Sequence, residues 1–252
     1  MTTSHSRRAS LAAVCGVALA SLTLTAAGAT AAETGGATAA APGSGAAPIV
    51  TTTDGAVRGT AGTGGDAFLG LPYAAPPTGN LRWRPPQPPA HWRDVRAATS
   101  FAPSCPQNPA GNPFLPPGLM SEDCLYLNVY TPAPRGSDED GRPVLVWIHG
   151  GGLTQDGGRN YDPATLAADG VVVVTINYRL GALGFLAHPA LADAKGQSGD
   201  YGLMDQQAAL RWVQRNIAGF GGNPRNVTIF GESAGGLSTL SQVASPQAKG
   251  LF

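Results

Sequence analysis

The sequence predicts an α/β fold in which a mostly parallel sheet is covered by helices on both faces. Residues 171–176 form an apolar run, rich in Val and without alternation, which is typical of a strand buried on both faces. Helical and strand-like patterns then alternate along the chain, from 204–218 through 227–230 to 237–244. Such alternation is typical of parallel strands that are joined by helices.

The patterned sequence begins with a predicted hairpin. Residues 49–53 and 56–60 are strand-like, and an Asp-Gly dipeptide between them favours a tight turn. A short apolar segment follows at 68–71. The proline-rich stretch 72–89 then predicts extended coil on the surface, because proline removes backbone donors and fixes φ.

Two more strands are predicted before the buried run, at 125–130 and 144–148, and the charged loop 135–142 separates them. A helix is predicted over about 204–218, because apolar residues recur there at roughly helical spacing and glycines follow. Another helix is predicted at 237–244, and a proline shortly after it prevents its continuation.

Residues 1–32 are predicted to be an export signal peptide. Arg7 and Arg8 precede the apolar run 11–27, and small residues at 29–31 offer a cleavage site. The paired arginines also resemble a twin-arginine signal. A transmembrane anchor is the alternative, but the run is rich in Ala, Gly and Thr and shorter than the ~20 apolar residues of a span. We therefore expect a secreted protein without a stable membrane anchor.

Residues 33–48 are expected to be a flexible linker, because small and polar residues there bury too little apolar surface to offset the entropy of ordering. The folded part is expected to span 49–252. The chain has 16 basic and 16 acidic residues and a formal net charge of zero. This balance indicates neither nucleic acid nor an acidic membrane as a partner, and small uncharged ligands fit it better.

The chain has three cysteines, of which Cys15 lies in the predicted signal peptide. The remaining pair, Cys105 and Cys124, can form a disulfide in an exported protein. Two free buried thiols are the alternative. Neither the spacing of the cysteines nor their neighbours indicate a metal site.

A serine in a glycine-rich turn is the strongest functional motif. Ser233 lies in the sequence GESAG at 231–235, between the predicted strand 227–230 and a predicted helix. An α/β-hydrolase presents its serine nucleophile on such a strand–turn–helix element, and glycines are needed where the backbone is crowded. The N–H groups of a helix that begins near Ala234 also favour negative charge at the reacting centre.

A second glycine motif, HGGG at 149–152, follows the predicted strand 144–148. Consecutive glycines let backbone N–H groups face the oxyanion of a tetrahedral intermediate. Gly151 and Gly152 are the candidate donors, with the N–H of Ala234 as the third. A plain glycine-rich turn without a role in catalysis is the alternative.

The groups that would activate the serine are not apparent in the sequence. In an α/β-hydrolase the acid and the histidine follow the serine in the chain, yet residues 234–252 contain no Asp, Glu or His. We do not expect His91, His149 or His188 to act as the base. Glu232 is next to the nucleophile and cannot orient a histidine opposite it, so we expect it to anchor the turn or polarise the site.

Several stretches resemble the type-B carboxylesterase family, which includes the cholinesterases. They are FGGNP at 220–224 with GESAG at 231–235, EDCLYLNV at 122–129, LPYA at 71–74 with LRW at 81–83, and NYRLG at 177–181 with GFL at 184–186. The resemblance covers about residues 49–252 and implies an α/β-hydrolase that cleaves carboxylic esters through an acyl-serine. It implies Ser233 as the nucleophile and Gly151, Gly152 and Ala234 as the oxyanion hole.

The resemblance also implies a disulfide between Cys105 and Cys124. Family members are longer than this chain, and their acid and histidine lie beyond the position of Phe252, so the chain resembles an N-terminal half that is truncated after the nucleophile. Cholinesterases hold a quaternary ammonium by a cation–π contact with a Trp between these cysteines. This chain has only Phe114 as an aromatic residue there, so a choline ester is not expected as the preferred substrate.

Three hypotheses follow from the sequence. The first is an exported serine carboxylesterase for small or medium uncharged esters that needs no cofactor and no metal, with Ser233 and its oxyanion hole in this chain and the base and acid outside it. The second is a non-catalytic, hydrolase-like binding or adhesion module. The third is an inactive truncated gene product. Arg179 and Asp205 are expected to join buried ion pairs or helix ends that hold the sheet and the Ser233 turn.

Overall fold

The computed structural model describes residues 46–108, 118–133, 140–194 and 196–252, all within the unit Ala41–Phe252. The predicted signal peptide, Cys15, Phe114 and most of the predicted linker lie outside the described residues. Pro48, at the end of that linker, is buried, and its carbonyl oxygen accepts a hydrogen bond from the Gly59 N–H at 2.9 Å. Ordered structure therefore begins before Ile49. None of the helices in the described ranges combines the length and the apolarity that crossing a membrane requires.

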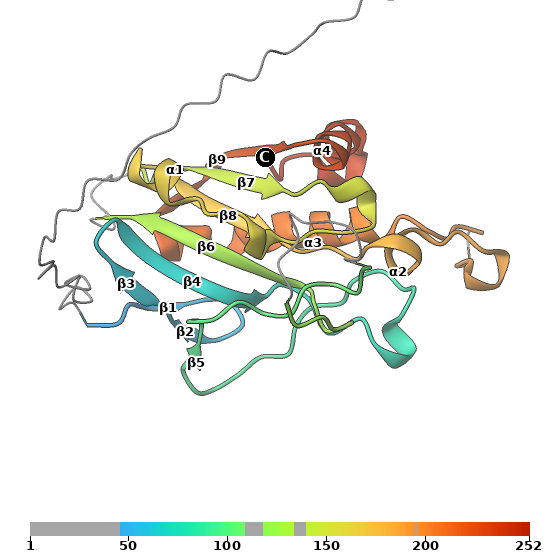
Figure 1. Cartoon of the computed structure of the whole chain (residues 1–252), viewed down its shortest axis with the longest axis horizontal. Coiled ribbons are helices and arrows are strands. Elements are labelled where there is room, and N and C mark those ends of the chain that lie inside the picture. Colours follow the sequence, from blue (N-terminus) through green and yellow to red (C-terminus); the bar gives the residue numbers. More distant parts are fainter. Residues whose placement is uncertain (1–45, 109–117, 134–139, 195) are drawn as a thin grey trace, which may run out of the picture. The chain divides into compact units, whose positions relative to one another are not determined.

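A six-stranded sheet lies at the centre of this unit (Figure 1). Its strands, in spatial order, are β3 (Thr60–Gly62), β4 (Gly65–Pro72), β6 (Tyr126–Pro132), β8 (Val172–Ile176), β7 (Arg142–Ile148) and β9 (Gly222–Gly231). β7 pairs in parallel with both β8 and β9, whereas the pairs β3–β4, β4–β6 and β6–β8 are antiparallel. The sheet is thus mixed, and the parallel arrangement that the sequence predicts is found in the half that leads to Ser233.

A smaller sheet contains β1 (Ile49–Thr51), β2 (Ala56–Arg58) and β5 (Arg96–Ala97). β1 and β2 form the predicted hairpin, with Val50 opposite Val57. The proline-rich segment that follows β4 contains one 3₁₀ turn, Gly79–Leu81, and otherwise runs as coil through residue 95. The prediction of coil is therefore confirmed after Pro72, which belongs to β4, but the start of the segment is not on the surface, because Pro72, Tyr73, Ala74 and Pro77 are buried.

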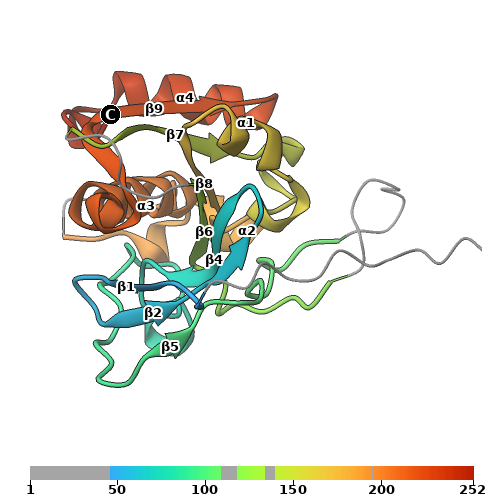
Figure 2. The ribbon, with the colours of Figure 1, turned by 90° about the vertical axis from the view of Figure 1, so that its left-hand side faces the viewer.

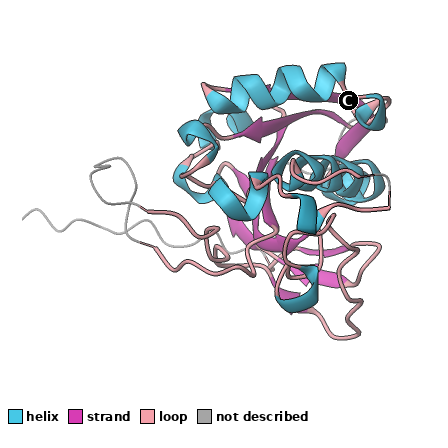
Figure 3. Cartoon of the chain, turned by 90° about the vertical axis from the view of Figure 1, so that its right-hand side faces the viewer, coloured by secondary structure: helices cyan, strands magenta, loops and turns pink. Residues whose placement is uncertain are grey.

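Within the described ranges, four α-helices accompany the large sheet, together with several 3₁₀ turns. They are α1 (Ala164–Ala168), α2 (Gly181–Phe185), α3 (Tyr201–Asn216) and α4 (Ala234–Ala244). Figure 2 shows α3 on one side of the sheet and α1 on the other, and Figure 3 shows the helices against the strands. All five residues of β8 are buried between them, which explains why that strand has no alternating pattern. The helices α1 and α2 are too short for a periodic signal, and the sequence did not predict them.

The long helix α3 is held to the sheet by aromatic packing. Trp212, which is fully buried, lies 5.7 Å from the ring of Phe220, and Phe220 meets Phe68 of β4 edge to face at 4.9 Å. Aromatic pairs with this offset geometry add to the free energy of burial. This packing fixes the position of α3, and α4 lies against α3.

Buried glutamine side chains join α3 to α4. Gln206 donates to the hydroxyl of Ser238 at 3.0 Å and accepts from the amide of Gln242 at 2.9 Å. Gln207 donates to the oxygen of Gln242 at 3.0 Å and to the hydroxyl of Ser245 at 3.1 Å. Buried amides stabilise only when they are paired, so this network fixes the position of α4 relative to α3.

A buried ion pair connects the end of β8 to α3. Arg179 donates from Nε to Oδ2 of Asp205 at 2.7 Å and from Nη2 to Oδ1 at 2.7 Å. The side chains are 3% and 0% exposed. Burial raises the pKa of the Asp205 carboxyl, and the hydrogen bonds from Arg179 oppose that rise. The expected structural role of both residues is confirmed, and the structure shows that they pair with each other.

We expect Asp205→Asn to lower the free energy of unfolding by about 3–5 kcal/mol, because it leaves the Arg179 guanidinium buried without a counter-charge. Urea denaturation followed by tryptophan fluorescence measures the change. Asp140→Asn is the matched control, since Asp140 pairs with Arg225 at 3.7 Å and both side chains are more than 80% exposed. The control should change stability by less than about 1 kcal/mol. A similar, small loss for both variants would contradict the prediction.

Candidate active site

Ser233 occupies a strained turn between β9 and α4. β9 ends at Gly231 and α4 begins at Ala234, and Ser233 between them has φ 55° and ψ −121°. A residue other than glycine is rare at positive φ, and such strain costs on the order of 1–3 kcal/mol unless the surroundings impose it. The side chain is exposed. The turn thus presents the serine hydroxyl at the N-terminal end of a helix.

Two glycines permit the tight packing of this turn. A Cβ atom at Gly231 would lie 2.5 Å from the carbonyl carbon of Gly235 and 2.6 Å from the oxygen of Ile148. A Cβ atom at Gly235 would overlap the same Ile148 oxygen, at the end of β7. Only glycine fits at both positions, so the turn is pressed directly against the end of the neighbouring strand.

The HGGG motif lies beside Ser233. A Cβ atom at Gly150 would be 3.3 Å from Cβ of Ser233 and 2.8 Å from the carbonyl oxygen of Glu232. Gly151 and Gly152 have φ 75° and 63°, which glycine adopts without strain. The structure therefore brings the glycine loop at 149–152 beside the serine turn at 231–235, although the two motifs begin 82 residues apart in the chain.

The N-terminus of α4 contributes a further donor. Ala234 is the first residue of this helix, and the first N–H groups of a helix have no partner within it. The aligned peptide dipoles also make this end electropositive. The N–H of Ala234 therefore remains a candidate oxyanion donor together with those of Gly151 and Gly152.

His149 is a buried, neutral support of the glycine loop. Its ring stacks on that of Tyr178 with centroids 4.3 Å apart, and Tyr178 donates to the carbonyl oxygen of His149 at 2.8 Å. Burial lowers the pKa of His149 to about 4, against a smaller opposing effect of Asp156. Nε2 has no hydrogen-bond partner among the described residues. The ring orients the loop, in line with the expectation that it is not the base.

Asp156 anchors the far end of the glycine loop. Its carboxylate accepts hydrogen bonds from the N–H of Gly157 at 2.7 Å, from the amide of Asn160 at 2.8 Å and from the hydroxyl of Tyr161 at 2.5 Å. Burial and this hydrogen bond raise the pKa of Tyr161, so the phenol stays protonated. Asp156 itself has φ 93° and Leu153 has φ 61°. The loop is strained, and its polar contacts hold it in place.

Gln107 links the same loop to the disulfide. Cys105 and Cys124 are bonded, with sulfur atoms 2.04 Å apart, so the alternative of two free thiols does not apply. Gln107 accepts from the N–H of Asp156 at 2.7 Å and donates to its carbonyl oxygen at 2.8 Å. It also donates to the carbonyl oxygen of Cys105 at 3.1 Å. Nothing in the sequence signalled Gln107 or Asp156, because both act through contacts between distant segments.

The remaining polar candidates do not reach the serine. His91 lines a cavity to which Ser233 does not contribute. The exposed His188 accepts a hydrogen bond from the N–H of Ala190 at 3.1 Å. The carbonyl oxygen of Glu232 accepts from the N–H of Gly235 at 2.8 Å, which closes the turn. Among the described residues, no His, Cys, Asp and Glu side chains gather into a group of three that could bind a metal ion.

Residues 46–252 match the model of the carboxylesterase family. A cocaine esterase from Oryctolagus cuniculus is 52% identical over 222 residues, which are 82% of this chain and 41% of that protein. A para-nitrobenzyl esterase from Bacillus subtilis is 47% identical over 209 residues, which are 81% of this chain and 42% of that protein. The chain belongs to the carboxylesterase family and has its α/β-hydrolase fold.

Solved structures agree with this assignment. A thermophilic para-nitrobenzyl esterase superimposes with a TM-score of 0.76 at 46% identity and covers 82% of this chain and 43% of its own. The carboxylesterase of Geobacillus stearothermophilus gives a TM-score of 0.73 at 46% identity, with 81% and 41% covered. The chain thus spans less than half the length of these relatives.

We expect Gly235→Ala to destabilise the fold by several kcal/mol, because its Cβ would overlap the Ile148 carbonyl oxygen. Gly236→Ala is the matched control in the same helical turn. Its Cβ would meet no atom closer than the Gly231 oxygen at 3.5 Å, so it should stabilise α4 by about 0.5–1 kcal/mol. Urea midpoints measure both changes. Equal effects of the two variants would show that the close approach to β7 is not a constraint.

We expect a pH dependence of stability from His149. Below pH 6.5 the unfolded chain binds a proton at this residue, but the folded chain does so only near its pKa of about 4. The free energy of unfolding therefore falls as the pH drops from about 6.5 to about 4, by on the order of 3 kcal/mol. His149→Gln should remove this slope and His188→Gln should retain it. A slope that is unchanged in His149→Gln would contradict the prediction.

Proposed function

We propose that this chain carries the nucleophilic half of a serine carboxylesterase active site. Ser233 is the nucleophile, and the N–H groups of Gly151, Gly152 and Ala234 form the oxyanion hole. The observation that carries the proposal is the position of the glycine loop, which is so near the serine turn that a Cβ atom at Gly150 would lie 3.3 Å from Cβ of Ser233. Family membership supports the same chemistry.

The proposed reaction has two steps. The Ser233 hydroxyl attacks the ester carbonyl while a histidine accepts its proton, and the oxyanion that forms rests on the three N–H groups. Collapse of this intermediate releases the alcohol, which takes the proton, and leaves an acyl-serine. Water then attacks the acyl group by the same route and releases the acid. Backbone donors that are fixed in advance are worth about 2.7–4 kcal/mol each in such a step.

We propose that the base and its acid are supplied from outside these 252 residues. No described histidine contacts Ser233, and His149 is neutral, buried and stacked on Tyr178. The outer face of α4 also supports a further polypeptide layer. It exposes Leu237, Leu240 and Val243 by 58%, 67% and 65%, beside the edge strand β9. Apolar side chains in a row of this kind are normally covered.

The proposed substrates are small esters without a negative charge. Relatives of this chain include a cocaine esterase and a para-nitrobenzyl esterase. In this chain the exposed Glu232 adjoins the nucleophile and disfavours an anionic group there. The proposed mechanism uses neither a metal nor an organic cofactor.

We also propose that residues 1–32 direct export and that the protein is secreted. The paired arginines, the apolar run and the small residues after it support an export signal. The Cys105–Cys124 disulfide is compatible with an oxidising compartment outside the cytoplasm.

A fluorophosphonate probe tests the proposed division of the site, because it reacts with a serine that has both a base and an oxyanion hole. We would compare this chain with a chimera in which residues 46–252 continue into the C-terminal part of the Bacillus subtilis para-nitrobenzyl esterase. The chimera should be labelled at Ser233, and this chain should react at least about a hundredfold more slowly. Peptide mass mapping identifies the labelled residue.

Ser233→Ala in the chimera is the control and should abolish labelling while the circular dichroism spectrum stays unchanged. Labelling of another serine in a folded chimera would refute Ser233 as the nucleophile. Equally fast labelling of this chain and of the chimera would show that the base lies within the 252 residues.

A further inference from the structure

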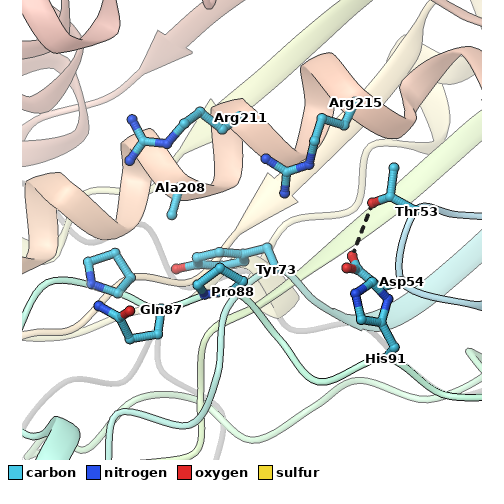
Figure 4. A pocket seen from close by; sticks show the side chains of 10 residues that line it. Thr53, Asp54, Tyr73, Gln87, Pro88, His91, Ala208, Arg211 and Arg215 are labelled. Atoms are coloured by element: carbon cyan, nitrogen blue, oxygen red, sulfur yellow. Dashed lines mark hydrogen bonds between the residues drawn. The ribbon is translucent and has the colours of Figure 1, made fainter.

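A cavity lies between α3 and the N-terminal segments, apart from the serine turn. It has a volume of about 340 Å³, and its lining residues come from α3, from the turn between β1 and β2, and from the coil after β4 (Figure 4). Neither Ser233 nor the glycine loop contributes to it. The ring of Tyr73, together with Pro86, Pro88 and Ala208, gives the cavity an apolar surface.

Two arginines give this cavity an unbalanced positive charge. Arg211 and Arg215 are four residues apart on α3, so both side chains project from the same face of the helix, where Figure 4 shows them along one wall. Neither guanidinium has a hydrogen-bond or carboxylate partner among the described residues. Burial, and then the charge of Arg215, lower the pKa of Arg211. Two like charges at this spacing destabilise a helix unless an anion balances them.

The one carboxylate in the lining does not neutralise the pair. Asp54 is buried, and its Oδ2 accepts from the hydroxyl of Thr53 at 3.4 Å, while no ion pair joins it to either arginine (Figure 4). Its single negative charge leaves an excess of one positive charge from the two guanidinium groups. His91 adds no negative charge to the lining. An anion can therefore bind without displacing an existing salt bridge.

Hydrogen bonds hold the walls of the cavity in place. The N–H of Thr53 donates to Oδ1 of Asn216 on α3 at 2.7 Å, which ties the β1–β2 turn to the helix. The N–H of Trp92 donates to the carbonyl oxygen of Asp54 at 2.9 Å. The Tyr73 hydroxyl donates to the carbonyl oxygen of Asn177 at 2.7 Å, so the ring is fixed. A cavity with fixed walls binds a ligand without a large cost of ordering.

We propose that this cavity is a binding site for a small carboxylate that carries an apolar body. The guanidinium groups of Arg211 and Arg215 donate to the carboxylate, which is the planar anion that arginine recognises in a bidentate manner. The apolar body lies against Tyr73 and the prolines. The site is separate from Ser233, so the proposal does not depend on the esterase function.

The test uses the full 252-residue chain and ligand-observed NMR, which detects weak binding whatever the oligomeric state of the protein. Benzoate is the probe, benzamide is its neutral analogue, and inorganic phosphate is a compact anion that competes for the guanidinium groups. We expect benzoate to bind with a dissociation constant of about 1 mM or lower, and benzamide to bind at least about tenfold more weakly. Phosphate should displace benzoate only at a several-fold higher concentration.

Substitutions of single residues show whether benzoate binds in this cavity. Arg211→Met and Arg215→Met should each weaken benzoate binding at least about tenfold, because each removes charged donors but keeps the length of the side chain. Arg225→Met removes an arginine that is 81% exposed on β9 and outside the cavity, so it should leave binding unchanged. Ser233→Ala should also leave it unchanged, which separates this proposal from the esterase function. Circular dichroism verifies that each variant is folded.

Four results would overturn the proposal. Benzoate binding that persists in folded Arg211→Met and Arg215→Met would refute the role of the arginines. An equal loss in Arg225→Met would indicate a general charge effect rather than this cavity. Phosphate that binds as tightly as benzoate, or the absence of benzoate binding at several millimolar, would refute a site for an apolar carboxylate.

Discussion

The close backbone contact between the Ser233 turn and the end of β7 is the constraint on which the rest of the site depends. Gly231 and Gly235 both face the carbonyl oxygen of Ile148 at distances that exclude a side chain. Because β7 pairs in parallel with β9, the C-terminal ends of both strands lie at the same end of the sheet. The loop that follows β7 and the turn that follows β9 therefore emerge side by side. The glycine loop is therefore brought beside Ser233 by strand pairing, and the glycines allow the final approach.

The surrounding contacts maintain a geometry that the local sequence would not adopt alone. Ser233, Leu153 and Asp156 all have positive φ, which is unfavourable for residues other than glycine. Asp156 is held by Gly157, Asn160, Tyr161 and Gln107, and the last of these is tied to the disulfide. The glutamine network between α3 and α4 fixes the helix that follows the serine. Strain near Ser233 is thus balanced by hydrogen bonds made several residues away.

Local patterns in the sequence were sufficient for the main elements and for the two glycine-rich motifs. The Val-rich strand, the hairpin at Asp54, the long helix and the GESAG turn are each encoded by neighbouring residues, and all were predicted close to their observed bounds. The antiparallel half of the sheet was not predicted, because the direction of β6 relative to β8 depends on how distant strands pair. Gln107, Asp156 and the buried glutamines were missed for the same reason.

The cavity beside α3 shows a further limit of sequence reasoning. Arg211 and Arg215 look like ordinary surface residues in the helical pattern, and only the fold brings them against Tyr73 and the turn after β1. We propose that the Ser233 hydroxyl is presented for attack while its base lies outside these 252 residues, because the hydrogen bonds of the described histidines go elsewhere. Steady-state hydrolysis of p-nitrophenyl acetate by the purified 252-residue chain and by Ser233→Ala tests it most directly. The account predicts equally slow hydrolysis by both, and enzyme-like turnover that is lost in Ser233→Ala would contradict it.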